Sequence, residues 1–186
     1  MSADRFGLRA RSVADLLALY ADVLTELRAR DIIRSTNNPV ADYSEWLVAK
    51  AFGYALAPKS SAGYDVIAPD GTRYQVKGRR SSTESPSRQL SFIRGFGGAT
   101  EPFDYMVGIL FNSDFTVMRA AQIPVADVHE LAVHNPHVNG WRFILRDSVW
   151  DRPGVVDVTG TLQQAATASI DETYAVDTKA IKDCRG

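Results

Sequence analysis

Cysteine is almost absent from the chain, since Cys184 is the only one among 186 residues. A disulfide framework and a cysteine-ligated zinc site are therefore excluded. Long hydrophobic runs are lacking as well, because the longest candidate, residues 103–111, is interrupted by Asp104 and Gly108. No segment reaches the length needed to span a membrane, and the N-terminus lacks the apolar core of a signal peptide. We therefore expect a soluble, cytoplasmic protein without a membrane partner.

A marked excess of either charge is also lacking. The chain carries 21 Lys and Arg against 22 Asp and Glu, a formal net charge of −1, which excludes a uniformly basic nucleic-acid coat protein and an acidic disordered protein. Its 45% hydrophobic residues are enough for a core. We expect one domain over residues 1–186, made of an N-terminal helix and connection (12–37), a core (38–120) and a C-terminal α/β extension (121–186) whose tail after Asp171 is disordered.

Helical spacing predicts two helices in the N-terminal part. Residues 12–30 carry an apolar stripe behind a capping pair, Ser12 and Asp15. Residues 38–53 begin with Asn-Pro and end with Gly, which are typical start and stop signals. The first helix is longer than the core needs. We consider it a candidate homodimer surface, and covering one face of the sheet is an equally good explanation.

From Tyr54 onward the apolar period changes to two, which indicates strands. Segment 105–111 is apolar on both faces and is expected to be central in its sheet. Residues 78–88, rich in serine, read as a loop. The order of elements predicts an α/β (α+β) fold with a central mixed β-sheet flanked by helices. Further strands are expected at 64–68, 72–77, 90–93, 115–119 and 141–145, and short helices at 125–133 and 160–170.

Polar side chains converge around the turn Pro69-Asp70-Gly71. Gln75 and Lys77 are two residues apart on one strand and share a face. A three-residue loop with Gly71 in the left-handed conformation places Asp65 directly opposite Gln75. A two-residue loop would place Asp65 opposite Val76 instead, on the wrong face. The three-residue loop is the one that this sequence favours.

Glu45 is the fourth polar residue of this group. Position 49 is Ala, so Glu45 has no downstream helical ion-pair partner. Two carboxylates, an amide oxygen and an ammonium group at a sheet edge form a site for a hard cation such as Mg²⁺. A metal there would polarise a phosphoryl oxygen and activate water, and Lys77 would orient the nucleophile or offset developing charge.

Glu45, Gly63-Tyr64-Asp65, the Pro-Asp-Gly turn and Gln75-Val76-Lys77 together resemble the PD-(D/E)xK nuclease superfamily, in its Mrr-like Gln-x-Lys form. The resemblance covers residues 38–80 closely and the element order to about 120. It implies a restriction-endonuclease-like core and a metal-dependent DNA endonuclease in restriction, repair or recombination. Asp65, Gln75 and the Val76 carbonyl would bind Mg²⁺, for which Mn²⁺ can substitute. Glu45 would hold a second metal or its waters, and Lys77 would act on the attacking water.

Alternatives to a nuclease site remain for these residues. Asp65 can cap backbone amides beside a turn, and Gln75 with Lys77 can be the solvated face of an ordinary hairpin. Because Gln75 is uncharged where the family pattern has an acid, a catalytically degenerate module that binds nucleic acid or protein is the second hypothesis. A third places an enzyme site at His129, His134 and His137, although capping or surface roles are commoner for such residues.

The charge of the chain is locally uneven around the proposed site. Six basic residues and one acid lie between Arg73 and Arg94, a local charge of +5. Lys, Arg, Ser and Thr are the usual phosphate contacts, so we expect DNA to be held here, with Phe92 to Gly98 as a flexible flap. A solvated loop balanced by acids elsewhere would have the same composition. The expected phosphate contacts are Arg79, Arg80, Arg88 and Arg94.

Overall fold

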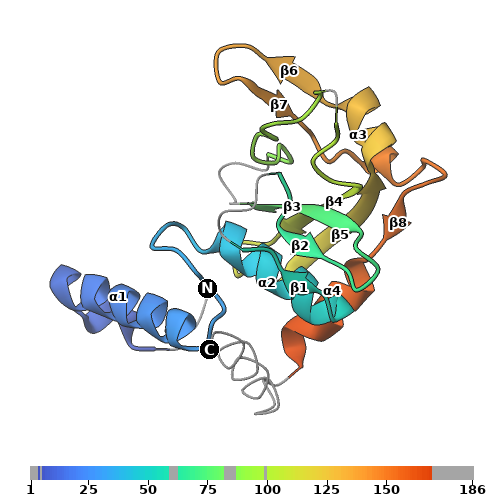
Figure 1. Cartoon of the computed structure of the whole chain (residues 1–186). Coiled ribbons are helices and arrows are strands. Elements are labelled where there is room, and N and C mark those ends of the chain that lie inside the picture. Colours follow the sequence, from blue (N-terminus) through green and yellow to red (C-terminus); the bar gives the residue numbers. More distant parts are fainter. Residues whose placement is uncertain (1–3, 5, 59–62, 82–86, 99, 169–186) are drawn as a thin grey trace, which may run out of the picture.

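A computed structural model describes residues 4, 6–58, 63–81, 87–98 and 100–168, and the expected disorder after Asp171 lies outside them. Six strands form a mixed sheet in the order β1-β2-β3-β4-β5-β8 (Figure 1). The central pair, β3 and β4, is parallel, and the other neighbours are antiparallel. The predicted α+β class, with a mixed sheet and flanking helices, is confirmed. The strands are β1 (Ala55–Leu56), β2 (Val66–Ile67), β3 (Arg73–Arg80), β4 (Tyr105–Phe111), β5 (Val117–Pro124) and β8 (Val156–Asp157).

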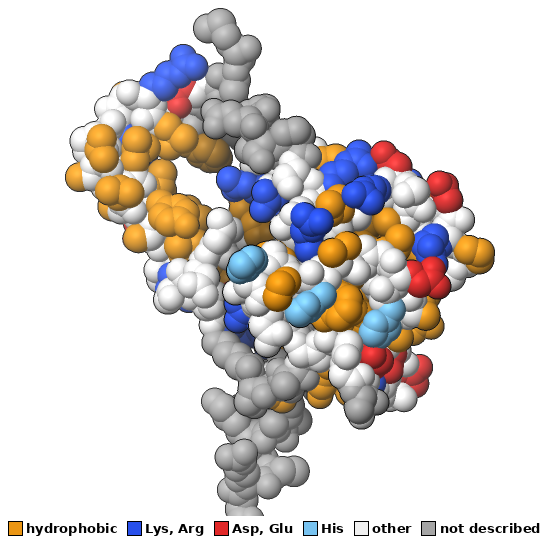
Figure 2. Space-filling view, turned by 90° about the horizontal axis from the view of Figure 1, so that it is seen from above, with side chains coloured by type: hydrophobic (Ala, Val, Ile, Leu, Met, Phe, Trp, Pro, Cys, Tyr) orange, Lys and Arg blue, Asp and Glu red, His pale blue; other side chains and the backbone are white. Residues whose placement is uncertain are grey.

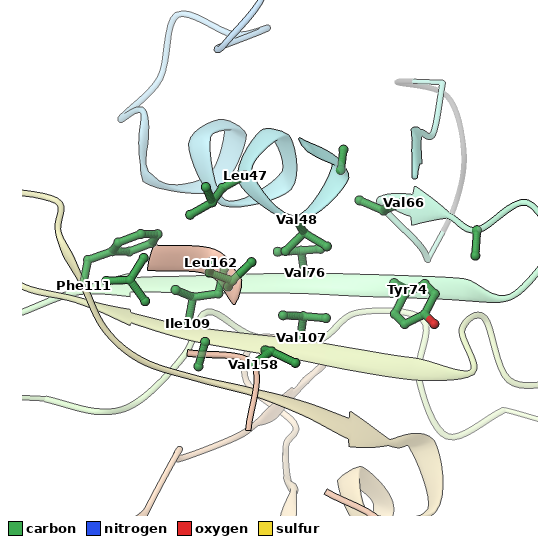
Figure 3. Packing of buried hydrophobic residues seen from close by; sticks show 14 residues of the cluster. Leu47, Val48, Val66, Tyr74, Val76, Val107, Ile109, Phe111, Val158 and Leu162 are labelled. Carbon is green, nitrogen blue, oxygen red and sulfur yellow. The ribbon is translucent and has the colours of Figure 1, made fainter. Parts of the chain in front are cut away.

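The helices α2 (Val40–Phe52) and α4 (Thr159–Thr167) cover one face of the sheet (Figure 1). Leu47 and Val48 of α2 lie over Val76 of β3, and Leu162 of α4 lies beside Ile109 (Figure 3). All five side chains are at most 5% exposed. Full burial of such side chains stabilises the fold by about 1.5–3 kcal/mol each. This core fixes α2, and therefore Glu45, relative to β3.

A second core covers the opposite face of the sheet. It is built from α3 (Val125–Leu131), the hairpin β6 (Val133–Asn135) with β7 (Gly140–Arg142), and the segment 87–96. The expected strand at 90–93 forms only one isolated bridge, from Ile93 to Trp141, and Gln89 just before it forms another to Ile144. Phe96 is 6% exposed, and its carbonyl accepts a hydrogen bond of 2.9 Å from the indole of Trp141. Its predicted role in a flexible flap is wrong, because its ring packs into this core.

The helix α1 (Val13–Ala29) begins at the predicted capping box, in which Ser12 and Asp15 bond to each other's backbone N–H. It lies apart from the sheet (Figure 1). It contacts the body through a small cluster in which Leu24 packs with Ile32 and Ile33. The alternative that it covers a sheet face is therefore wrong, since the other helices do so.

No helix within the described residues is both long and apolar enough to cross a bilayer. Short 3₁₀ turns occupy Leu8–Ala10 and Asp147–Val149.

Strand β3 continues past its predicted end at Lys77 as far as Arg80, so the expected loop at 78–88 is wrong over its first residues. Gly78 explains the difference. A Cβ atom added there would lie 2.0 Å from Oγ of Ser44 on α2. Glycine is needed because α2 packs this closely against the strand, whereas in the sequence alone the residue is typical of a loop.

Candidate functional site at the edge of β3

The β2–β3 hairpin has the predicted three-residue loop. Gly71 adopts a φ of 89°, and the Ala68 N–H donates to the Thr72 carbonyl at 2.9 Å. Val66 pairs with Tyr74, so the next residues outward, Asp65 and Gln75, lie opposite each other. The register that brings these two side chains together is therefore confirmed.

Asp65 is held by two donors on β3. Its Oδ2 atom accepts a hydrogen bond from the Gln75 side-chain amide and another, of 2.7 Å, from the Val76 N–H. Gln75 is only 5% exposed. The Oδ1 atom accepts no hydrogen bond from the residues that the structure describes. One carboxylate oxygen therefore fixes the local geometry, and the other is left for a further ligand.

The backbone carbonyl of Val76 is a second oxygen donor at this edge. The N–H and C=O of one strand residue point toward the same neighbouring strand, and the Val76 N–H points toward Asp65. Strand β2 pairs with β3 only at residues 73 and 74, so the carbonyl faces the region beyond the end of the ladder. The early end of β2 thus leaves this carbonyl without a ladder partner on β2.

The donor set fits a magnesium ion that retains water ligands. Asp65 offers a carboxylate oxygen, Val76 a carbonyl oxygen and Gln75 an amide oxygen if its side chain turns over. Mg²⁺ is commonly held by one or two carboxylates with waters and phosphate oxygens. No group of three His, Cys, Asp or Glu side chains able to hold a metal occurs in the described part of the chain. A metal here would therefore depend on these amide and carbonyl oxygens.

Glu45 faces a cavity of about 300 Å³ that Asp65 also lines. Its Oε2 atom lies 2.5 Å from Nη2 of Arg34. Burial raises the pKa of the Glu45 carboxyl, the nearby charge of Asp65 raises it further, and the hydrogen bond from Arg34 lowers it. The structure therefore gives Glu45 a cationic partner from the connection before the helix, not from the helix itself.

Arg34 is a residue of this cavity that sequence reasoning missed. Its Nη1 atom donates to the Ala57 carbonyl at 2.9 Å, and Asp42 accepts hydrogen bonds of 2.9 and 2.7 Å from the N–H groups of residues 34 and 35. The residue stands in a polar connection without a motif. The sequence indicates this contact only weakly, through a basic residue that shortly precedes a helix with two acidic residues.

Lys77 follows Gln75 on the same face of β3 and is half-buried. Burial lowers the pKa of its ammonium group, whereas the charges of Asp65 and Glu45 raise it and Arg94 lowers it. Among the described residues its Nζ atom makes no hydrogen bond or ion pair. Lys77 does not line the cavity that contains Glu45. It stands within electrostatic reach of both carboxylates without being paired to either.

The four arginines expected to contact phosphate do not form one surface. Arg79 and Arg80 are consecutive on β3 and point to opposite faces. Arg80 lies over the ring of Phe115, 4.6 Å from its centroid. Arg88 bonds Asp147 at 2.8 Å, whereas Arg94 is exposed and acts electrostatically on Lys77. Arg79 and Arg94 therefore remain the candidates nearest to the proposed chemistry.

The three histidines occupy a different part of the molecule. His129 bonds Glu101 at 2.7 Å and stacks on Phe96 with ring centroids 4.2 Å apart. His134 packs against Trp141. These are packing contacts of the second core, and the described residues offer no metal cluster there.

Comparison with known proteins does not assign the chain to a family. No protein-family model matches it, and no curated protein is significantly similar in sequence.

Proposed function

We propose that the chain is a metal-dependent nuclease that hydrolyses phosphodiester bonds in DNA. The observation that carries this proposal is the convergence of Asp65, Gln75 and the Val76 backbone beside a partly buried Lys77 that has no ion-pair partner among the described residues. Cytoplasmic restriction, repair or recombination are the settings that fit such an activity. We also propose that the core of the sheet and its helices has a restriction-endonuclease-like fold.

The residues have separate roles in the proposed reaction. Asp65, Gln75 and Val76 supply oxygen ligands, and Mg²⁺ or Mn²⁺ bound there would polarise the phosphoryl oxygen and acidify a water. Lys77, whose pKa is lowered by burial, holds the attacking water or offsets the charge that develops on the phosphate. Arg34 neutralises Glu45 and brings a guanidinium to the cavity wall. Glu45, held by Arg34, would bind or position a second metal or its waters.

Cleavage of plasmid, linear duplex and single-stranded DNA in Mg²⁺ and in Mn²⁺ tests the proposal. Asp65→Asn retains an acceptor for the Val76 N–H, and Lys77→Met retains the apolar stem, so both variants should fold. We expect both to lose cleavage, and Arg142→Ala, which replaces an exposed cation on β7, to retain it. Wild-type activity that survives in both site variants would overturn the assignment.

A catalytically degenerate module that binds nucleic acid is the second candidate, favoured by the neutral Gln75 and by the Arg34–Glu45 pair. Metal-dependent stability separates the two. A ligand that binds only the folded state raises Tm, so Mg²⁺ or Mn²⁺ should stabilise a nuclease and not Asp65→Asn. Absence of cleavage and of metal stabilisation, together with salt-sensitive DNA binding, would favour the module.

DNA binding itself is tested with two arginine variants. Arg94→Ala should weaken binding to all sequences and reduce the slope of log K against log salt by about one. Arg88→Ala should lower stability and leave affinity unchanged, because Arg88 pairs with Asp147. Electrophoretic or anisotropy titrations at several salt concentrations measure both effects. An unchanged salt slope for Arg94→Ala would remove that residue from the interface.

A further inference from the structure

The helix α1 carries an apolar face that the other described residues of the chain leave exposed. Val13 is 75% exposed, Leu17 64% and Tyr20 54%, and this face is visible as hydrophobic side chains on the protruding helix (Figure 2). Only Leu24, near the C-terminal end, is buried in this helix. Contiguous apolar patches of several hundred Å² mark interaction sites in soluble proteins.

The spacing of this face is that of a helix–helix seam. Apolar residues recur at 13, 16, 20, 23 and 27, with alternating intervals of three and four residues, and Leu17 and Leu24 widen the same stripe. That is the a/d pattern of helices that pack side by side along their length. The stripe continues over the N-terminal turns, which lie outside the cluster that joins the helix to the body in the described part of the chain. The contacts between α1 and the body therefore cover only the C-terminal end of the stripe.

A groove of about 600 Å³ runs between α1 and the body. Tyr20 and Val23 line its helix side, and Tyr43, Trp46 and Phe115 line the other. Figure 2 shows the hollow beside the protruding helix. The groove is continuous with the exposed stripe, so a partner on α1 would also cover aromatic side chains of the body.

We propose that the occupant is a second copy of this chain, in a symmetric dimer whose two α1 helices pack antiparallel and cross at Tyr20. The stripe is self-complementary about that residue. A twofold axis there places Val13 opposite Leu27 of the partner subunit and Leu17 opposite Val23 of the partner subunit. An interface in which both copies use the same patch is the usual arrangement of a homodimer.

The exposed area is sufficient for a dimer. The five exposed residues 13, 16, 17, 20 and 23 present about 500 Å² per copy, so pairing buries about 1,000 Å², the lower bound for a specific interface. The polar face of α1 disfavours other partners. Asp15, Asp22 and Glu26 outnumber its single base, Arg28, whereas helices that lie on membranes or contact DNA are rich in Lys and Arg.

Sedimentation equilibrium of the full chain tests the dimer, which does not depend on the proposed nuclease activity. We expect a concentration-dependent dimer that Leu17→Glu converts to a monomer whose far-UV circular dichroism spectrum remains that of the wild type. Ala18→Glu adds the same charge at an exposed position outside the stripe and should leave the dimer intact. A wild type that is monomeric throughout the series, or that binds anionic vesicles through α1 as a monomer, would overturn the inference.

Cysteine crosslinking tests the antiparallel crossing. In a Cys184→Ser background, Tyr20→Cys places one thiol on the twofold axis and should form an intermolecular disulfide on mild oxidation, because disulfides need Cβ atoms about 4 Å apart. Ala18→Cys is the matched control and should remain reduced. Equal crosslinking of both variants, or none at position 20 in a dimeric protein, would refute this geometry.

Discussion

The substitution Gln75→Glu gives the sharpest test of the metal site. In the structure the Gln75 amide donates a hydrogen bond to Oδ2 of Asp65, and Gln75 is 5% exposed. Glutamate has the same shape but replaces the donor with an oxygen. The variant therefore brings two carboxylates together in a partly dehydrated site, where only a cation between them can relieve their repulsion.

The expected destabilisation without metal is large. A hydrogen bond to a charged group contributes about 1.5–3 kcal/mol, and repulsion between adjacent charges near a protein surface adds to its loss. We expect the free energy of unfolding at neutral pH to fall by about 2–4 kcal/mol. For a domain of this size that corresponds to a Tm lower by about 5–15 °C.

Addition of Mg²⁺ or Mn²⁺ should reverse this loss. Gln75→Glu should regain most of its Tm in a concentration-dependent way and show a larger metal-induced shift than the wild type, because its site carries one more negative charge. Gln75→Met is the matched control, since it also removes the donor but supplies no oxygen. Thermal unfolding followed by circular dichroism measures all three proteins. Equal metal-induced shifts in the Glu and Met variants would refute a metal site at Asp65.

Two further predictions concern the scaffold of the site. Gly78→Ala should lower the free energy of unfolding by about 1–3 kcal/mol, because the new Cβ lies 2.0 Å from Oγ of Ser44. Gly98→Ala, where a Cβ meets nothing within 4 Å, should change it little in the same denaturant titration. Arg73 lowers the pKa of Asp104 through hydrogen bonds. The free energy that this pair contributes to folding is therefore present above the ordinary pKa of aspartate, and it is lost as the pH falls through the lowered pKa. Asp104→Asn should therefore cost about 1 kcal/mol at pH 7, since the pair is partly exposed, and the difference should vanish in strong acid.

The parts of the site that the sequence predicted correctly are those set by local geometry. The Pro69-Asp70-Gly71 loop fixes the hairpin register because Gly71 takes a left-handed conformation within the turn itself. That register alone places Asp65 opposite Gln75. The capping box at Ser12 is local for the same reason, since its partner is three residues away.

The parts that could not be predicted depend on contacts between distant segments. Arg34 reaches Glu45 across eleven positions and Ala57 across twenty-three, and no local pattern encodes either contact. Gly78 reads as a loop residue until Ser44 is seen against it. Phe96 lies between glycines and suggests a flap, yet tertiary packing buries it. In each case the chemistry of the residue is evident from the sequence, but the distant residue that it contacts is not.

Lys77 distinguishes a catalytic role from a purely structural role for the polar residues at this edge of β3. A carboxylate that caps the Val76 N–H accounts for Asp65 alone. It gives no reason for an ammonium group whose pKa is lowered by burial and which has no ion-pair partner among the described residues. Burying a charge in this way opposes folding, and groups that cost stability are often retained for function.

Lys77→Met should therefore raise Tm while abolishing metal-dependent DNA cleavage. Methionine retains the length of the apolar stem and removes the buried charge. Arg142→Ala removes an exposed cation instead and should change neither quantity. A Lys77→Met protein that is less stable than the wild type would mean that the ammonium supports the fold. Retained cleavage would mean that Lys77 takes no part in the reaction. The Tm and the cleavage assay together therefore distinguish a structural from a catalytic role of Lys77.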